Sequence, residues 1–513
     1  MLAKIYSAAV HGIDAFAVTV EAVVDKGTAF TIVGLPDTAV KESYQRILAA
    51  MQQSGLYFPH CRIVINLSPA DVKKEGAAFD LPMALGILAA NENIDGSAMA
   101  DCMVTGELSL DGSVLPVKGV LPMAIAARSL GYRRMIVPEA NATEAAVVNN
   151  LEVYGVKNLA QTVAFLNGNE DISPTIVDTR EQFRLHSGSF PFDFSEVKGQ
   201  FAVKRALEVA CAGGHNILLV GSPGSGKSMM AKRIPSILPP LSLMEALETT
   251  KIHSVAGKLG RGSMLMTSRP FRAPHHTVSP VALVGGGATP QPGEISLAHN
   301  GVLFLDEFPE FPRTVLEVLR QPVEDRVITV SRAKYTVDYP ASFMLVASMN
   351  PCPCGWHGHP TKPCTCMPGA VQKYMNRISG PLLDRIDLQI EISPVEFDEM
   401  ADNMPAESSS DIRARVVKAR AVQQERFRGE PNTHCNAQMT PSQIRRYAWP
   451  DDAGLKRLKS AMERHSMSAR AFDRILKVAR TIADLDGSEQ VLSQHIAEAI
   501  GYRNLDRTSY ASF

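Results

Sequence analysis

The sequence has few of the features that mark secreted, membrane or highly charged proteins. Only 6% of its 513 residues are aromatic, and the formal net charge is −1, so no excess of positive charge indicates a nucleic-acid partner. A local basic channel is sufficient to bind DNA, so a near-neutral total does not exclude one. The most apolar stretch, residues 81–90, is about half as long as a membrane-spanning helix. The first residues also lack the apolar core of a signal peptide, so we expect a cytoplasmic protein without a membrane partner.

Cysteine is sparse and unevenly distributed, which argues against a disulfide scaffold. Four of the eight cysteines are scattered along the chain, and four lie within residues 350–369. Scattered cysteines in a cytoplasmic enzyme are mostly small buried apolar residues, so only the cluster needs a separate explanation. The length predicts roughly two to four domains, each able to bury its own core.

The pattern of apolar and polar residues changes three times along the chain. Residues 1–167 alternate strand-like and helical runs, which predicts a compact mixed α/β domain, whereas residues 168–195 are polar and interrupted by Pro and Gly, as in a linker. Residues 196–393 have the helix, buried strand, glycine loop and further buried strands of an α/β nucleotide-binding core. Residues 394–513 begin with an acidic loop, and helices are predicted at 411–427, 441–447, 452–465, 468–484 and 489–501.

A phosphate-binding loop is the strongest motif. Residues 215–234 place G-x4-G-K-S between a buried strand and a helix, where glycines let backbone N–H groups turn toward a phosphate. Lys227 would contact the β- and γ-phosphates, and the Ser228 hydroxyl would bind Mg²⁺. A chance glycine-rich turn is the alternative, and the flanking strand and helix argue against it. The predicted loop comprises Gly221, Ser222, Pro223, Gly224, Ser225, Gly226, Lys227 and Ser228.

Two further apolar strands end in polar residues that suit a nucleotide site. Residues 301–310 contain Asp306, a predicted Mg²⁺ ligand, followed by Glu307, the predicted general base for the attacking water. Another strand ends in Asn350, whose amide would orient that water. A capped strand end and an ordinary turn asparagine are the alternatives. With the phosphate loop, these residues predict an ATP hydrolase that uses ATP and Mg²⁺.

Three arginines are candidates for contacts with the γ-phosphate. Arg385 lies between apolar residues at a predicted strand start, where its cation would stabilise transition-state charge at a neighbouring subunit's nucleotide. Arg377 competes for that role. Arg470 begins a helix near the C-terminus and would couple hydrolysis to movement of a lid. A surface salt bridge or a solvated arginine is the alternative for each.

The cysteine cluster consists of two C-x-C pairs separated by nine residues. Four thiolates in a short loop rich in Pro and Gly suit tetrahedral structural Zn²⁺, although this spacing is tighter than the usual C-x2-C. His357 and His359 are substitute ligands, and free thiols or a redox-sensitive pair are the alternatives to a metal. The predicted zinc ligands are Cys352, Cys354, Cys364 and Cys366.

The longest motifs resemble the magnesium-chelatase-like branch of AAA+ ATPases. They are residues 269–307, LRQPVEDRVITVSRA, MNPCPCG and RISGPLLDRIDL, and within that branch the whole chain resembles the ComM/YifB family. The resemblance implies an AAA+ P-loop core with a helical lid and a homohexameric ring, with Arg385 presented across the subunit interface. It also implies a DNA helicase that drives branch migration in recombination and in the integration of transforming DNA.

The same resemblance assigns roles to two other segments. VGGG (284–287) would form a hairpin tip that faces the pore of the ring. Residues 326–340 alternate apolar and polar residues, as a hairpin does, and carry Arg326, Arg332 and Lys334. Cations near the ring axis suit tracking along the phosphate backbone of single-stranded or branched DNA without base readout. A purely structural hairpin is the alternative.

Residues 104–138 resemble the Lon protease domain and the degenerate copy of it in the RadA recombination ATPases, which implies an S5-like α+β domain. Lon uses a Ser–Lys dyad, and the matching positions here are Ala78 and a position near Leu121. Neither side chain can do that chemistry, so we expect no peptidase activity and a role in ring assembly or DNA contact. Metal insertion into a porphyrin and protein remodelling are the alternative functions of the whole chain.

Overall fold

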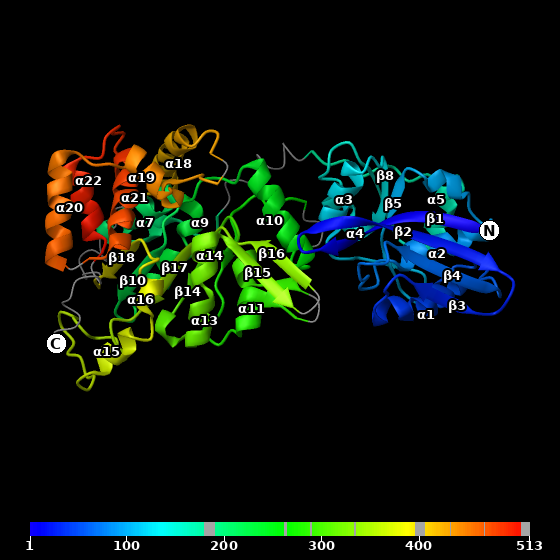
Figure 1. The fold of residues 1–513 in the computed structure, drawn as a ribbon, viewed down its shortest axis with the longest axis horizontal. Helices are drawn as coiled ribbons and strands as arrows, with labels where there is room; N and C mark the ends of the chain where they lie inside the picture. Colours follow the sequence, from blue (N-terminus) through cyan, green and yellow to red (C-terminus); the bar gives the residue numbers. More distant parts are fainter. Residues whose placement is uncertain are drawn as a thin grey trace. The chain divides into compact units, whose positions relative to one another are not determined.

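The chain forms two compact units in the computed structural model (Figure 1). The first comprises Met1–His186, Leu243–Thr267 and Pro290–Pro292, and the second comprises Ser187–Ser242, Ser268–Thr289 and Gly293–Phe513. The residues that the structure describes are 1–178, 190–260, 264–287, 290–332, 335–394, 406–430, 432–465 and 467–503.

The first unit is built on a seven-stranded mixed sheet with the order β3-β4-β2-β1-β5-β8-β9. β2 pairs antiparallel with β1 and β4, whereas β5, β8 and β9 continue from β1 in parallel and β3 is parallel to β4. A two-stranded ribbon, β6 (Glu107–Leu108) with β7 (Val114–Leu115), lies outside this sheet. The sheet strands are β1 Leu2–His11, β2 Asp14–Asp25, β3 Phe30–Val33, β4 Arg62–Ser68, β5 Cys102–Val104, β8 Arg134–Pro138 and β9 Glu152–Val156.

Helices of the first unit pack on the long central strands. α2 and α3 contact β1 and β2, and α1 packs on α2. Every residue of α2 is buried, and no charged or polar side chain follows Asp80 in it, as expected of a helix without a solvent-facing side. α1 begins where the Asp37 carboxylate accepts a hydrogen bond from the Val40 N–H, an ordinary N-cap. The helices are α1 Thr38–Gln53, α2 Asp80–Ala90, η1 Gly96–Met99, α3 Val120–Ser129, α4 Glu139–Ala145 and α5 Leu159–Leu166.

A segment between the phosphate loop and Asp306 packs within the first unit. α10 (Leu243–Val255) lies on α3, and Leu247 joins the apolar cluster that α3 and α4 form. The Ser254 hydroxyl donates a hydrogen bond to the buried Glu144 carboxylate, which also accepts an N–H of α3 at 3.0 Å. The predicted boundaries, which assigned all of 196–393 to one core, did not anticipate this packing.

The second unit is built on a five-stranded parallel sheet with the order β11-β14-β17-β10-β18. β10 leads into the phosphate loop, β14 leads to Asp306, and β17, which leads to Asn350, lies between them. The carboxyl ends of these three strands therefore meet at one edge, where ligand sites of open α/β sheets form. The strands are β10 Ile217–Gly221, β11 Phe271–Arg272, β14 Val302–Leu305, β17 Met344–Met349 and β18 Leu388–Ile392.

Shorter elements connect these strands. β15 (Val327–Arg332) pairs antiparallel with β16 (Tyr335–Pro340), so the hairpin predicted from alternation is confirmed. In VGGG, Val284 ends α11, Gly285 and Gly286 form β12, and Gly287 lies in the turn that follows; the placement of this segment at a pore stays a prediction. The other short elements are η2 Phe194–Glu196, α8 Lys227–Ala231, α9 Ile234–Ile237, α11 Pro280–Val284, β12 Gly285–Gly286, β13 Gln291–Pro292, α12 Glu294–Leu297, η3 Phe308–Glu310, α13 Arg313–Val318, α14 Arg320–Asp325, α15 Ala370–Met375 and α16 Gly380–Leu383.

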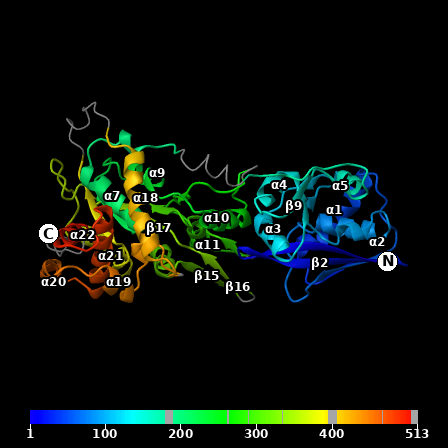
Figure 2. The same cartoon turned by 90° about the horizontal axis from the view of Figure 1, so that it is seen from above.

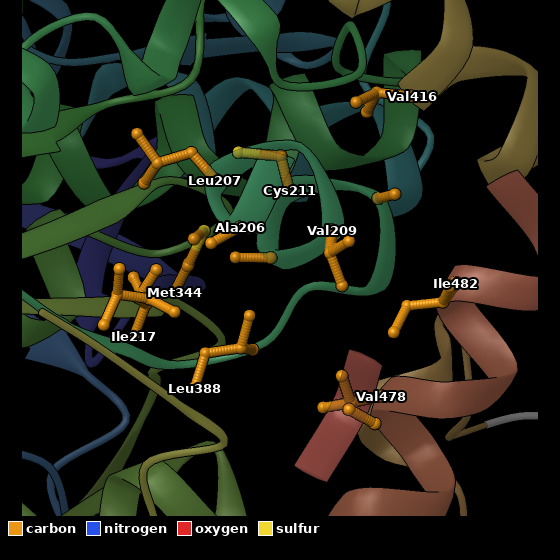
Figure 3. Packing of buried hydrophobic residues seen from close by; sticks show 14 of the residues in the cluster. Ala206, Leu207, Val209, Cys211, Ile217, Met344, Leu388, Val416, Val478 and Ile482 are labelled. Carbon is orange, nitrogen blue, oxygen red and sulfur yellow. The ribbon is translucent and has the colours of Figure 1, made fainter. Parts of the chain in front are cut away.

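The C-terminal helices pack on the parallel-sheet core as a separate helical layer. α18 and α21 lie against α7 (Phe201–Gly213), as Figure 2 shows. Val478 and Ile482 of α21 share one apolar cluster with Val209 of α7 (Figure 3). The helices follow the predicted segments and are α18 Ser409–Arg426, η4 Asn436–Gln438, α19 Pro441–Tyr447, α20 Asp452–His465, α21 Ala469–Leu485 and α22 Ser493–Gly501.

Two predicted loops are described only in part. Residues 179–189 of the predicted linker and 395–405 of the predicted acidic loop lie outside the described residues. The beginning of the linker packs as part of the first unit, because the Thr175 N–H donates to the Val153 carbonyl at 2.8 Å. In the described part of the chain, we find no helix with the length and apolar character required to cross a bilayer.

Val478→Ala is expected to lower the free energy of unfolding of the second unit by about 1–3 kcal/mol, because it removes two packed methyl groups and leaves a cavity. Val478 is 1% exposed, whereas Val422 of α18 is 44% exposed. The matched control Val422→Ala should change stability by less than about 0.5 kcal/mol. Trp356 and Trp449 both lie in this unit, so denaturation followed by tryptophan fluorescence reports on it. Equal destabilisation by both variants would contradict the packing of α21 on α7.

Candidate nucleotide site

The phosphate loop connects β10 to α8 through two turns that require glycine. Gly224 and Gly226 have φ angles of +81° and +89°, in the left-handed region that side-chain-bearing residues rarely adopt. Gly226 immediately precedes the first helical residue, Lys227. The local sequence therefore determines the shape of the loop, and the predicted strand, loop and helix occur in that order.

The Lys227 ammonium is folded back onto its own loop. It donates hydrogen bonds to the carbonyls of Gly221 at 2.7 Å and Ser222 at 2.9 Å, and to the side-chain oxygen of Asn350 at 3.2 Å. Burial lowers the pKa of Lys227, and the charge of Asp306 opposes that shift. All three acceptors are neutral and do not cancel the positive charge of this buried side chain, so binding of an anion here is favourable. The position and charge of the Lys227 ammonium therefore suit a phosphate group.

The two halves of the predicted magnesium site meet directly. The Ser228 hydroxyl donates to Oδ2 of Asp306 at 2.6 Å, across 78 residues of sequence. The other carboxylate oxygen accepts a hydrogen bond from the buried Ser348 hydroxyl. Hydroxyl and carboxylate oxygens are the ligands that Mg²⁺ takes in nucleotide sites, so these residues fit the ion. Ser348 fixes the orientation of Asp306 in the way that outer-shell groups orient metal ligands.

Glu307 follows Asp306 in a strained conformation. Its φ angle is +53°, unusual for a residue with a side chain, and its N–H donates to Oδ1 of Asp306 at 3.0 Å. Its carboxylate, 57% exposed, lies 3.2 Å from Nδ1 of His276. The His276 ring also contacts the His275 ring at a tilt of 35°, with ring centroids 4.0 Å apart. The predicted base therefore has a histidine partner that the sequence pattern did not reveal.

Each predicted arginine lies near an acidic residue of the same chain. Arg385, only 15% exposed, pairs with Glu324. Arg377, 52% exposed, pairs with Glu310 at 2.6 Å. Arg470 is 63% exposed, and a carboxylate oxygen lies 3.8 Å from its guanidinium. A contact of Arg385 with a neighbouring subunit would first require the loss of its pair with Glu324.

A buried ion pair that the sequence analysis missed joins the lid to the start of β18. Asp387 pairs with Arg474 of α21 and accepts the Asn216 N–H at 3.0 Å. Although burial opposes the effect, Arg474 and His215 hold the pKa of Asp387 well below its usual range. Asp387 lies two residues after Arg385, so this pair fixes the chain beside the predicted trans arginine.

The hairpin cations do not share one environment. Arg326 has a φ angle of +59° and ends α14, and burial lowers the pKa of its guanidinium while Cys435 and Asp387 oppose that shift. This position near the junction of lid and core argues against a DNA contact by Arg326. The side chain of Arg332 and all of Lys334 lie outside the described residues.

The four thiols of the cysteine loop converge on one point. Their sulfur atoms all lie within 4.8 Å of one another, and the sulfurs of Cys352, Cys354 and Cys364 are 3.3 to 3.8 Å apart. A tetrahedral ion with Zn–S bonds of about 2.3 Å would place its sulfurs about 3.8 Å apart. The His357 N–H approaches the Cys352 sulfur at 3.3 Å, and such contacts stabilise thiolate ligands. Nδ1 of His359 instead accepts backbone N–H groups of its own turn.

Comparison with known proteins agrees with this geometry. Models for magnesium chelatase subunit ChlI match residues 193–400 and 20–141, and the model for its C-terminal part matches residues 406–503. Competence protein ComM of Haemophilus influenzae is 43% identical over 509 residues, which cover 99% of this chain and 98% of that protein. The YifB protein of Escherichia coli is 41% identical over 510 residues, with the same coverage. The chain belongs to the ComM/YifB family.

Membership of the ComM/YifB family makes the second unit a magnesium-chelatase-like AAA+ ATPase core. A Lon protease homolog of Caenorhabditis elegans is 33% identical over 95 residues, 18% of this chain and 10% of that protein. Together with the two sheets, these matches confirm the predicted fold class, an AAA+ P-loop core with a helical lid preceded by a Lon-like α+β domain. Leu121 is buried, and its N–H donates to Glu144 at 3.0 Å. The absence of peptidase activity in this ComM/YifB-family chain stays a prediction.

Ser348→Ala should raise the Mg²⁺ concentration needed for half-maximal ATP hydrolysis by roughly 10- to 100-fold, because Asp306 loses the donor that orients it. Ser296→Ala is the matched control, since Ser296 is equally buried and its hydroxyl has no hydrogen-bond partner among the described residues. The measurement is a magnesium titration of ATP hydrolysis. A magnesium requirement as low as that of the control would show that Ser348 does not position Asp306.

Proposed function

We propose that this ComM/YifB-family protein is a ring-forming, ATP-driven motor that moves on single-stranded or branched DNA during recombination or natural transformation. The observation that carries the proposal is the meeting of Lys227, Ser228, Asp306 and Asn350 at one edge of the parallel sheet. A relative named as a competence protein, similar along its whole length, supports the link to transforming DNA.

ATP bound with Mg²⁺ supplies the phosphoanhydride bond and the metal charge in this proposal. Ser228 and Asp306 would hold the metal ion, and Lys227 would exchange the carbonyls of its own loop for phosphate oxygens. Loss of the Lys227 contact would free the Asn350 amide to orient the attacking water. Glu307 would leave His276 and accept the proton of that water.

Two arginines are candidates for the contact with a neighbouring subunit's nucleotide. Arg385 would stabilise charge at a neighbouring subunit after release from Glu324, whereas Arg377 would lose only an exposed ion pair. Arg470 begins α21, the helix that packs on α7, and would connect the nucleotide to lid movement. A trans arginine requires an oligomer, and the assembly in our proposal is a homohexamer.

The β15–β16 hairpin is the proposed DNA contact. Thr329, Ser331 and Thr336 are exposed on it, and hydroxyl groups commonly contact phosphate oxygens of nucleic acids. These contacts read no base, which suits a motor that acts on many sequences. We further propose that the cysteine loop holds structural Zn²⁺ through its four thiols.

Two other functions have specific support. The family models are described as magnesium chelatase, which favours a motor for insertion of Mg²⁺ into a porphyrin. The partial match to a Lon protease homolog favours remodelling of proteins. Both would use the same nucleotide site, so the substrate that stimulates hydrolysis distinguishes them.

Glu307→Gln should retain ATP binding and lower the rate of hydrolysis by about 10²- to 10⁴-fold, since it removes the proposed general base. Lys227→Ala should lose nucleotide binding itself. Glu463→Gln is the matched control, because Glu463 is 69% exposed on α20 and should leave both properties unchanged. Binding of a fluorescent ATP analogue and phosphate release are the two measurements. Hydrolysis at the parental rate by Glu307→Gln would remove Glu307 from the mechanism.

Single-stranded DNA should stimulate ATP hydrolysis, whereas a porphyrin and an unfolded protein should not. Stimulation should weaken steeply as salt rises, because contacts to phosphates displace counterions. The measurement compares the three ligands side by side at several salt concentrations, with Lys227→Ala as the inactive control. Stimulation by the porphyrin or the unfolded protein, with no response to DNA, would replace the DNA motor with the corresponding alternative.

A further inference from the structure

The cysteine loop contacts the phosphate loop at two points that flank the first pair of thiols. At one point the Asn350 side-chain oxygen accepts a hydrogen bond from Lys227 at 3.2 Å. At the other, Gly355 approaches Pro223 so closely that a Cβ on Gly355 would lie 2.5 Å from the proline Cδ. Residues 350–355 therefore bridge the end of β17 and the phosphate loop.

Cys352 and Cys354 lie inside this bridge. The Gly355 N–H closes a turn onto the Cys352 carbonyl at 3.0 Å, so the bridge is compact. Cys364, which comes later in the sequence, brings its sulfur to 3.5 Å from that of Cys354. A metal held by all four thiols would thus connect the bridge to the far end of the cysteine loop.

The far end of the loop leads to another part of the proposed active site. After Cys366 the chain enters α15 at Gly369, and the buried Tyr374 anchors this helix. Arg377, one of the two candidate trans arginines, follows directly and pairs with Glu310. One ion in the thiol cluster would therefore fix the residues that contact the phosphate loop. It would also fix the N-terminus of α15, the helix before Arg377.

We propose that Zn²⁺ in the cysteine loop holds residues 350–355 against the phosphate loop, so that metal occupancy sets the affinity for nucleotide. The inference rests on the proposed ATPase function and adds a regulatory role for the metal. A flexible loop without metal would leave Asn350 and Gly355 less well placed, and nucleotide binding would have to order them. The ordering lowers the observed affinity, because a preorganised site avoids that entropic cost.

Two glycine variants separate this contact from general strain in the loop. Gly355 and Gly369 have nearly equal φ angles of +82° and +78°, but a Cβ on Gly369 would meet no atom within 4 Å. Gly355→Ala should keep one Zn²⁺ per chain, because the change leaves all four thiols in place. The added Cβ would displace Pro223 and with it the phosphate loop, so binding of a fluorescent ATP analogue should weaken by about tenfold, the effect of losing one hydrogen bond to a charged phosphate. Gly369→Ala should keep both the metal and the affinity. Equal affinities of the two variants would overturn the inference.

Removal of a thiol that lies outside residues 350–355 tests the role of the metal itself. Cys364→Ser should lose Zn²⁺ and weaken nucleotide binding, whereas Cys61→Ser, at an exposed cysteine of the first unit, should change neither. Zinc content is measured by elemental analysis of the full-length protein. Loss of Zn²⁺ with unchanged affinity, or parental protein without Zn²⁺, would overturn the inference and leave the ATPase proposal intact. Parental protein that binds Zn²⁺ but no ATP would instead refute the ATPase function on which the inference rests.

Discussion

The hydrogen bond between Ser228 and Asp306 is the contact on which the nucleotide site depends. It joins α8, the helix after β10, to the end of β14, and these two strands are not neighbours in the sheet. The strand between them, β17, contributes Ser348 to the same carboxylate and Asn350 to the lysine of the phosphate loop. All these groups meet because the strands are parallel, so that their carboxyl ends share one edge.

The residues that could be predicted from the sequence are those whose chemistry follows from a local pattern. A glycine loop before Lys227 predicts phosphate binding, and an acidic pair after a buried strand predicts a metal ligand and a base, wherever the strand lies in the sheet. Ser348 could have been found, because it lies two positions before Asn350 on β17 and therefore faces the same side. His276 could not, because only the three-dimensional path of the segment before β14 brings it to Glu307.

The helices show the same division between local pattern and long-range packing. α21 could be predicted because its apolar residues recur at helical spacing and its first turn is capped by Ser468. The docking of α10 in the first unit could not, since a buried hydrogen bond from Ser254 to Glu144 joins residues far apart in the sequence. The surroundings of Arg326 were missed for the same reason: alternation along β15 indicates a hairpin but not which groups lie near the residue that precedes it.

Asn350 contacts the phosphate loop through its side chain and continues into the cysteine loop through its backbone, so it can couple binding at the two sites. Its amide contacts the lysine that would move to the phosphates, and its backbone leads within two residues to Cys352. A nucleotide that draws Lys227 away would free the Asn350 amide for the nucleotide site, while the contact of Gly355 with Pro223 would still hold the cysteine loop on the phosphate loop. Linkage requires that two binding events coupled through one element affect each other by the same factor. If the ion in the loop favours nucleotide binding, nucleotide must equally favour retention of the ion, and the metal would be held most tightly while the motor is loaded with ATP.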